Sequence, residues 1–206
     1  MESHPECGMV YTNHRTHNRL TGEIKNHIGY IEEGTTLCST QQLAFFHGHN
    51  YFCNASVMYR AYTLKKYVPL DDFISHRFYL QDWTCWIILS AYTHFDKMEI
   101  NTATFGIETD SITRPSSFDS LQDRFDNELE GYKYVCNMFP NSLRFDETGW
   151  YSYVDGCLLS LAYKKQDFLK AKEFGKRLKI SHSIKVMCSQ KKVLFYFYCF
   201  FKKIFF

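Results

Sequence analysis

The side chain best placed for acid–base chemistry is Asp82, in the stretch QDWTCWIIL at residues 81–89. Its carboxylate lies directly before an apolar run in which Trp83, Trp86 and Ile87 recur at three- and four-residue steps, the spacing of a helix. Asp82 is therefore expected at or just before the N-terminus of a helix, where backbone N–H groups and the helix dipole favour a negative charge. A carboxylate held in this way is either an N-cap or a general base that takes a proton from a nearby hydroxyl group.

Histidine and cysteine offer two weaker sites. The pairs HRTH at 14–17 and HGH at 47–49 have histidines close enough to ligate zinc, but Cys7 and Cys53 belong to no CxxC pair. Surface histidines are the simpler interpretation. A Cys–His nucleophile needs a thiol beside an oriented histidine, and Cys85 falls on the apolar helix, where a thiol is inert.

Composition narrows the class of protein. The chain has 206 residues, 45% hydrophobic and 22% charged, which is typical of a globular protein. A net charge of +2 gives no basic footprint, so nucleic acid is not an expected partner. Eight widely spaced cysteines, with no secretory signal and no apolar run long enough to span a membrane, predict a cytoplasmic protein with free thiols.

Residues 1–115 alternate between short apolar runs and turn residues, which predicts a mixed α/β region with the helix of Asp82 inside it. The predicted strands are 7–12, 24–31, 53–60 and 100–107, with a turn at 21–23, a short helix at 41–46 and loops at 69–72 and 109–111.

After residue 115, apolar residues recur at helical spacing in three stripes. They run from Leu121 to Phe139, from Trp150 to Leu161 and from Phe168 to Leu178, with Asp167 as the N-cap of the third. This pattern predicts an all-helical region of two or three hairpinned helices.

The last stretch, residues 191–206, brackets aromatic side chains with lysines. It is too short to span a membrane. Lysines flanking aromatic residues are typical of a helix that lies in a bilayer interface, so peripheral membrane contact is one interpretation. A helix packed on the rest of the chain is the other.

Four segments in order resemble the second half of bacterial family-2 glycosyltransferases, which have a GT-A fold. Residues 1–12 (MESHPECGMVYT) resemble the family's E-x-H/N-P-E and G-x-V-Y-T segment, and residues 54–60 (NASVMYR) resemble S-S-V-M-F-R. Residues 80–86 (LQDWTCW) resemble E-D-W-x-L-W, and residues 105–113 (FGIETDSIT) resemble Y-R-I-H-x-x-S-I-T. The resemblance covers residues 1–115, roughly half of the chain.

This resemblance implies a fold class and a reaction. The fold class is α/β, with a partial GT-A-like mixed sheet at 1–115 and a helical C-terminal extension at 116–206. The reaction is inverting transfer of a sugar from a nucleotide-sugar to a glycan or lipid-linked acceptor in cell-surface polysaccharide or glycolipid synthesis, at the inner face of the membrane. Asp82 is the general base that the family motif implies, and Gln81, Trp83 and Ser111 are the substrate-binding residues.

This chain departs from the family pattern at the residues that would bind the nucleotide-sugar donor. The chain contains no Asp-x-Asp, the motif that binds Mg²⁺ or Mn²⁺ on the diphosphate in the complete family enzymes. Gln81 replaces the family's Glu, Gly106 its Arg, and Glu108 its His, so Glu108 is the one metal contact that the resemblance implies. We therefore expect that Met1 is an internal start, that the donor-binding half is missing and that this chain alone binds nucleoside diphosphate weakly and is inactive. A non-catalytic remnant or interaction module, with the helical region as its docking surface, is the alternative. An Asp-x-Asp segment encoded just upstream would distinguish the two.

Overall fold

The computed structural model describes residues 3–27, 52–79, 81–107, 115–178 and 183–205, the last five without their side chains. The chain forms two compact units. The first comprises Met1–Ile112 and Asp126–Phe145, and the second comprises Thr113–Phe125 and Asp146–Phe206. One helix carries residues of both units, so the predicted division at residue 115 stays a prediction.

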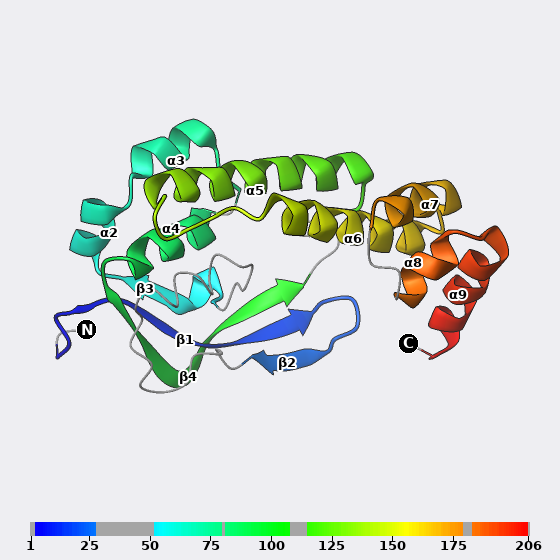
Figure 1. The fold of residues 1–206 in the computed structure, drawn as a ribbon. Helices are drawn as coiled ribbons and strands as arrows, with labels where there is room; N and C mark the ends of the chain where they lie inside the picture. The colour runs from blue at the N-terminus through cyan, green and yellow to red at the C-terminus, as the bar shows by residue number, and fades with distance from the viewer. Residues whose placement is uncertain (1–2, 28–51, 80, 108–114, 179–182, 206) are drawn as a thin grey trace. The chain divides into compact units, whose positions relative to one another are not determined.

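The first unit is built on a mixed sheet around β1 (Cys7–Asn18) (Figure 1). On one side β1 pairs antiparallel with β3 (Val57–Tyr59) and then with β2 (Ile24–His27). On the other side it pairs in parallel with β4 (His94–Ile107) along almost its whole length. Together with the helices of this unit, the sheet confirms the predicted mixed α/β class.

Sequence pattern placed most of these strands correctly but not their lengths. The predicted strand 7–12 continues to Asn18, because its polar second half gains ladder hydrogen bonds from strands on both sides. The turn after it is confirmed, with Gly22 at a φ of 72°, a value that glycine adopts at little cost. The predicted strand 53–60 is shortened, because Asn54–Ser56 forms the 3₁₀ turn η1, and only Val57–Tyr59 pairs with β1.

Three helices follow β3 in the first unit: α2 (Ala61–Tyr67), α3 (Leu70–His76) and α4 (Gln81–Ser90). The predicted loop at 69–72 is wrong, because α3 begins directly after Pro69. Proline is compatible with a helix start, and the acidic residues at 71 and 72 lie in the first turn, where the helix dipole favours their charge. The predicted helix at 41–46 lies outside the described residues.

The core of the first unit is centred on α4, which is buried from Trp83 to Ser90. A helix that is apolar on all sides is stable only when it is covered on all sides. Side chains of the sheet, including Met9 and Tyr11, share its core cluster. On another side Trp83 packs against Tyr132, with their ring centroids 4.4 Å apart. Because α4 is buried on several sides, the helix and the side chains on it are held in place.

Every element that the structure describes after residue 115 is a helix. These are α5 (Phe118–Met138), α6 (Glu147–Lys165), α7 (Phe168–Arg177), α8 (Ile184–Ser189) and α9 (Lys192–Phe205). The three predicted stripes correspond to α5, α6 and α7. The short α8 was not predicted, because six residues are too few to show a helical stripe.

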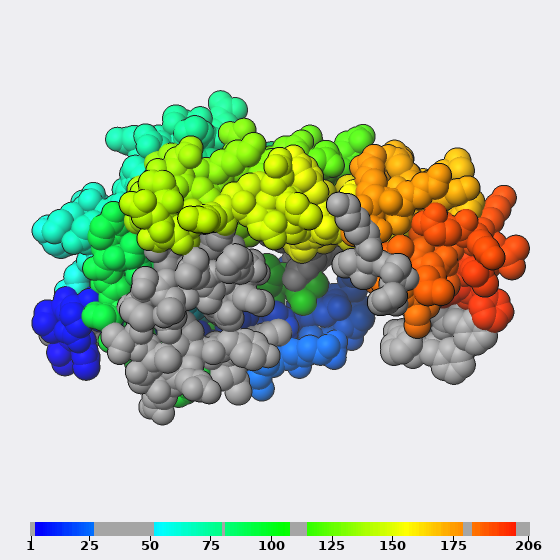
Figure 2. All heavy atoms as spheres, viewed as in Figure 1, coloured from blue at the N-terminus to red at the C-terminus, as the bar shows by residue number. Residues whose placement is uncertain are grey.

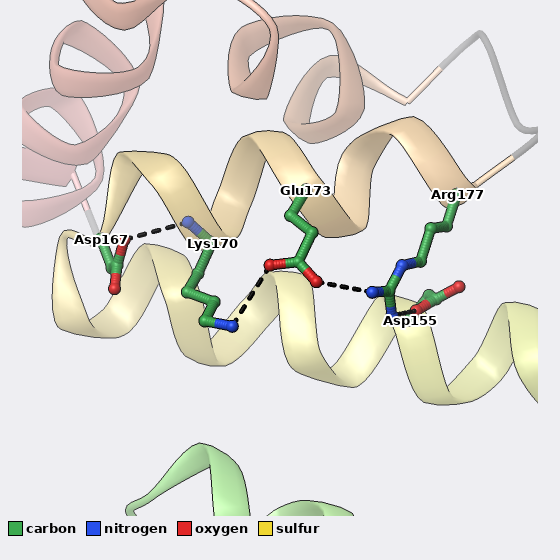
Figure 3. A network of polar contacts seen from close by, with 5 residues as sticks. All are labelled: Asp155, Asp167, Lys170, Glu173 and Arg177. Carbon is green, nitrogen blue, oxygen red and sulfur yellow. Dashed lines mark hydrogen bonds and ion pairs between the residues drawn. The ribbon is translucent and has the colours of Figure 1, made fainter.

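A polar network links α6 to α7 on the surface of the second unit (Figure 3). The Asp167 carboxylate accepts the backbone N–H of Lys170 at 3.0 Å, which confirms the predicted N-cap. Glu173 pairs with the Lys170 ammonium at 3.2 Å and with Arg177, whose guanidinium also lies 3.5 Å from the Asp155 carboxylate on α6. The exposed pairs of Glu173 with Lys170 and Arg177 each contribute about 0–1 kcal/mol, so they add little to the stability of this unit.

Two helical glycines in the second unit give opposite expectations for the same substitution. A Cβ on Gly175 of α7 would overlap the hydroxyl of the buried Ser189, whereas a Cβ on Gly156 of α6 would meet no atom within 4 Å. We expect Gly175→Ala to lower the free energy of unfolding by about 1–3 kcal/mol through overpacking. Gly156→Ala should raise it by about 0.5–1 kcal/mol, because alanine loses less backbone entropy in a helix. Urea denaturation of both variants checks this, and a loss of stability for both would contradict it.

Candidate functional site

Asp82 lies in the first turn of α4, as the sequence predicts, but inside the helix and not at its N-cap. The helix begins one residue earlier, at the exposed Gln81. The Asp82 carboxylate accepts the backbone N–H of Trp83 at 2.8 Å. The first backbone N–H groups of a helix have no partner within the helix, so this side chain satisfies one of them while it is held in a fixed direction.

The pKa of Asp82 is raised from its usual value, and burial of the carboxyl group is the main cause. Hydrogen bonds from the backbone N–H groups of Trp83 and of Asp82 itself act in the opposite direction but do not cancel it. The sequence-based expectation that capping keeps this group readily ionised is therefore incomplete. A carboxylate whose pKa is raised accepts a proton more readily, which is the property that a general base needs.

A phenol and two thiols from three parts of the first unit lie within the electrostatic influence of Asp82. Burial raises the pKa of Cys85 to about 12, and burial also raises the pKa values of Tyr59 and Cys53. The charge of Asp82 adds to each of these increases. Asp82 is therefore the member of this group that loses its proton at the lowest pH, and it carries the negative charge while its three neighbours stay protonated.

Sequence reasoning missed Tyr59 and Cys53 as neighbours of Asp82. The hydroxyl of Tyr59, on β3, accepts the indole N–H of Trp86 at 2.6 Å, so it ties the sheet to the second turn of α4. The only available signal was the position of Tyr59 at the end of a predicted strand. No periodicity reveals that this strand end lies beside a helix more than twenty residues later.

The other predicted site residues differ in their positions: one is buried, one is exposed and two are not described. Trp83 is only 3% exposed, and its ring contacts Tyr132, so its predicted contact with a sugar ring stays a prediction. Gln81 is exposed next to Asp82, where it can reach a ligand. Glu108 and Ser111 lie outside the described residues.

The described residues do not fit a divalent cation beside Asp82. Mg²⁺ and Mn²⁺ require several oxygen ligands, and within the described ranges no group of three or more His, Cys, Asp or Glu side chains converges on one point. The candidate zinc pair His14 and His17 lies on β1 at a spacing of three, which directs the two side chains to opposite faces of the strand. The pair at 47–49 is not among the described residues.

Comparisons with protein-family models, with curated proteins and with solved structures give no match for this chain. A function for the site must therefore rest on its residues and their geometry. What the geometry provides is one partly buried carboxylate at the start of a rigid helix, with an exposed polar residue beside it. Such an arrangement can accept one proton from a substrate.

Cys85 should be unreactive in the folded protein. It is 8% exposed, and its pKa of about 12 leaves almost no thiolate at pH 8. We expect alkylation by iodoacetamide to be at least about 10³-fold slower in the native protein than in guanidinium chloride, where the pKa returns to about 8.5. Mass spectrometry of the peptide that contains Cys85 measures this. Equal labelling in both conditions would show that the thiol is accessible and α4 is not buried as described.

Proposed function

We propose that this chain takes part in inverting, family-2-like glycosyl transfer, with Asp82 as the general base. The single observation that carries the proposal is the Asp82 carboxylate, which burial makes more basic and which the Trp83 N–H holds in place at the start of α4. The resemblance of residues 80–86 to the family's Asp-Trp motif supports it. The GT-A assignment of the mixed sheet is part of the same proposal.

The reaction assigns one role to Asp82. An acceptor hydroxyl oxygen attacks the anomeric carbon of the sugar and forms a new C–O bond. The bond from that carbon to the diphosphate oxygen breaks on the opposite face, and the diphosphate leaves with the electron pair. The hydroxyl proton goes to the Asp82 carboxylate, which must lie within hydrogen-bond reach of the hydroxyl in the reactive complex. Attack from the face opposite to the leaving group inverts the anomeric configuration.

The substrates follow from the same family resemblance. The donor is a nucleotide-sugar, and the acceptor is a glycan or a lipid-linked glycan used in cell-surface polysaccharide or glycolipid synthesis. The complete family enzymes hold the donor diphosphate with Mg²⁺ or Mn²⁺, so we propose that the donor half supplies the cation ligands. Gln81, Trp83 and Ser111 are proposed to contact the substrates, at the cytoplasmic face of the membrane.

The test is a transfer assay with the full chain, alone and together with a polypeptide that carries the family's Asp-x-Asp donor half. A panel of nucleotide-sugars, Mn²⁺ and glycan acceptors is supplied, nucleoside diphosphate release is measured, and NMR determines the anomeric configuration of the product. We expect transfer with inversion when both polypeptides are present. Retention of configuration would contradict the role of Asp82, and absence of transfer in both conditions would favour the non-catalytic interaction module.

A further inference from the structure

Helix α9 exposes an apolar stripe to solvent. Val193, Phe197 and Phe200 are 80%, 59% and 60% exposed, and their spacing of four and three residues places them along one side of the helix. Tyr196, 44% exposed, lies next to them. A surface helix of a globular domain normally directs polar side chains to solvent, so this stripe is unusual for a helix whose role is only structural.

The opposite side of α9 already packs against the second unit. Phe195 is fully buried, with its ring centroid 4.6 Å from that of Tyr163 on α6 and 5.7 Å from that of Phe168 on α7. Figure 2 shows α9, in red, at the molecular surface. The helix is therefore anchored through one side, and the stripe is exposed on another side.

Charge is strongly segregated toward this end of the chain. Residues 174–206 carry eight lysine and arginine residues and no aspartate or glutamate. This leaves 16 of the 24 basic residues, and all 22 acidic residues, in the rest of the protein. Lys191 and Lys192 are exposed at the start of α9, and two further lysines follow the stripe at 202–203.

We propose that α9 binds the surface of an anionic phospholipid bilayer. The stripe of Val193, Phe197 and Phe200 enters the boundary between headgroups and acyl chains, and the exposed Lys191 and Lys192 contact lipid phosphates. The 14-residue helix is about 21 Å long, shorter than the roughly 30 Å hydrocarbon core, so it lies in the interface. None of the helices that the structure describes has the length and apolar character required to cross a membrane.

Charge argues for lipid and against a second copy of this chain. Two copies that met through α9 would bring the two basic segments together, and like charges at an interface are repulsive. An anionic bilayer instead attracts each lysine near its surface. The proposal does not depend on the catalytic role of Asp82, so the two can fail separately.

Flotation of the full chain with vesicles tests the proposal. One set contains phosphatidylcholine with about one third phosphatidylglycerol, and the other contains phosphatidylcholine alone. We expect the protein to float with the anionic vesicles and much less with the neutral ones. Binding should fall as salt is raised from about 0.05 M to 0.5 M, because salt screens the lysines. Absence of flotation with anionic vesicles at low salt would overturn the proposal.

Two double variants separate the apolar and the charged contributions. Phe197→Ser with Phe200→Ser should weaken binding to anionic vesicles by about tenfold or more, since two aromatic side chains no longer enter the interface. The matched control, Tyr62→Ser with Ile74→Ser, removes two exposed apolar side chains from α2 and α3 and should leave binding unchanged. Equal losses for the two variants would contradict a specific role for α9.

Lys191→Gln with Lys192→Gln should weaken binding about fivefold for each lysine. Lys65→Gln with Lys66→Gln removes the same charge from α2 and should have little effect. Circular dichroism confirms that every variant is folded. Light scattering provides the last check. If the wild-type protein binds no vesicles but forms a dimer, and the Phe197 and Phe200 variant disrupts that dimer, the stripe binds a second copy of the chain. That result would overturn the proposal.

Discussion

Replacing Asp82 with asparagine is expected to reduce glycosyl transfer by about 10²- to 10⁴-fold, the usual contribution of a general base. Asparagine has nearly the same shape and can still accept the Trp83 N–H through its amide oxygen. It cannot take a proton from the acceptor hydroxyl. The loss should therefore appear in the rate of the chemical step, with little change in acceptor binding.

The same substitution should not destabilise the protein at pH 7. Burial raises the pKa of Asp82, so the folded state binds a proton more tightly than the unfolded state does. Stability from this group is then fully present below the unfolded pKa and is lost as pH rises through the folded pKa. Asp82→Asn removes a carboxylate that is costly to ionise at neutral pH. Urea denaturation should show a free energy of unfolding equal to or above that of the wild type.

The matched control is Asp71→Asn, in the exposed first turn of α3. It makes the same chemical change at a second helix start in the same unit and should leave the transfer rate unchanged. The wild-type rate should also rise with pH on an acidic limb whose midpoint lies above the ordinary aspartate pKa. Turnover above one tenth of the wild-type rate in Asp82→Asn would remove Asp82 from the role of base.

Replacing Trp86 with alanine is expected to have the largest effect on stability, a loss of about 3–5 kcal/mol. The Trp86 side chain is fully buried, its indole N–H donates to the Tyr59 hydroxyl, and its ring meets the edge of Phe52 with centroids 5.1 Å apart. Alanine would leave a cavity in the middle of the core and a partly buried hydroxyl without its donor. Urea denaturation followed by tryptophan fluorescence measures the change.

Two controls show where the loss comes from. Trp86→Phe keeps most of the apolar volume but removes the N–H donor, so it should cost less than Trp86→Ala. Tyr62→Ala removes an aromatic ring that is 68% exposed and should change stability by no more than about 0.5 kcal/mol. If Trp86→Ala cost less than about 1 kcal/mol, α4 could not be the centre of the core.

Features that depend on neighbouring residues were predictable from the sequence. Helical spacing located α5, α6 and α7, and the side-chain chemistry of Asp167 identified the start of α7. The apolar run after Asp82 located α4 and placed the candidate base in its first turn. Each of these features depends on contacts between residues three or four positions apart, which a sequence displays directly.

Features that depend on distant residues were decided only by the tertiary structure. The parallel pairing of β1 with β4 joins segments more than eighty residues apart, and it extends β1 through a polar stretch that alone does not predict a strand. The same holds for the site. Sequence identified Asp82 as a possible base, but only the tertiary structure buries its carboxylate and so raises its pKa, because desolvation depends on every element that covers a group.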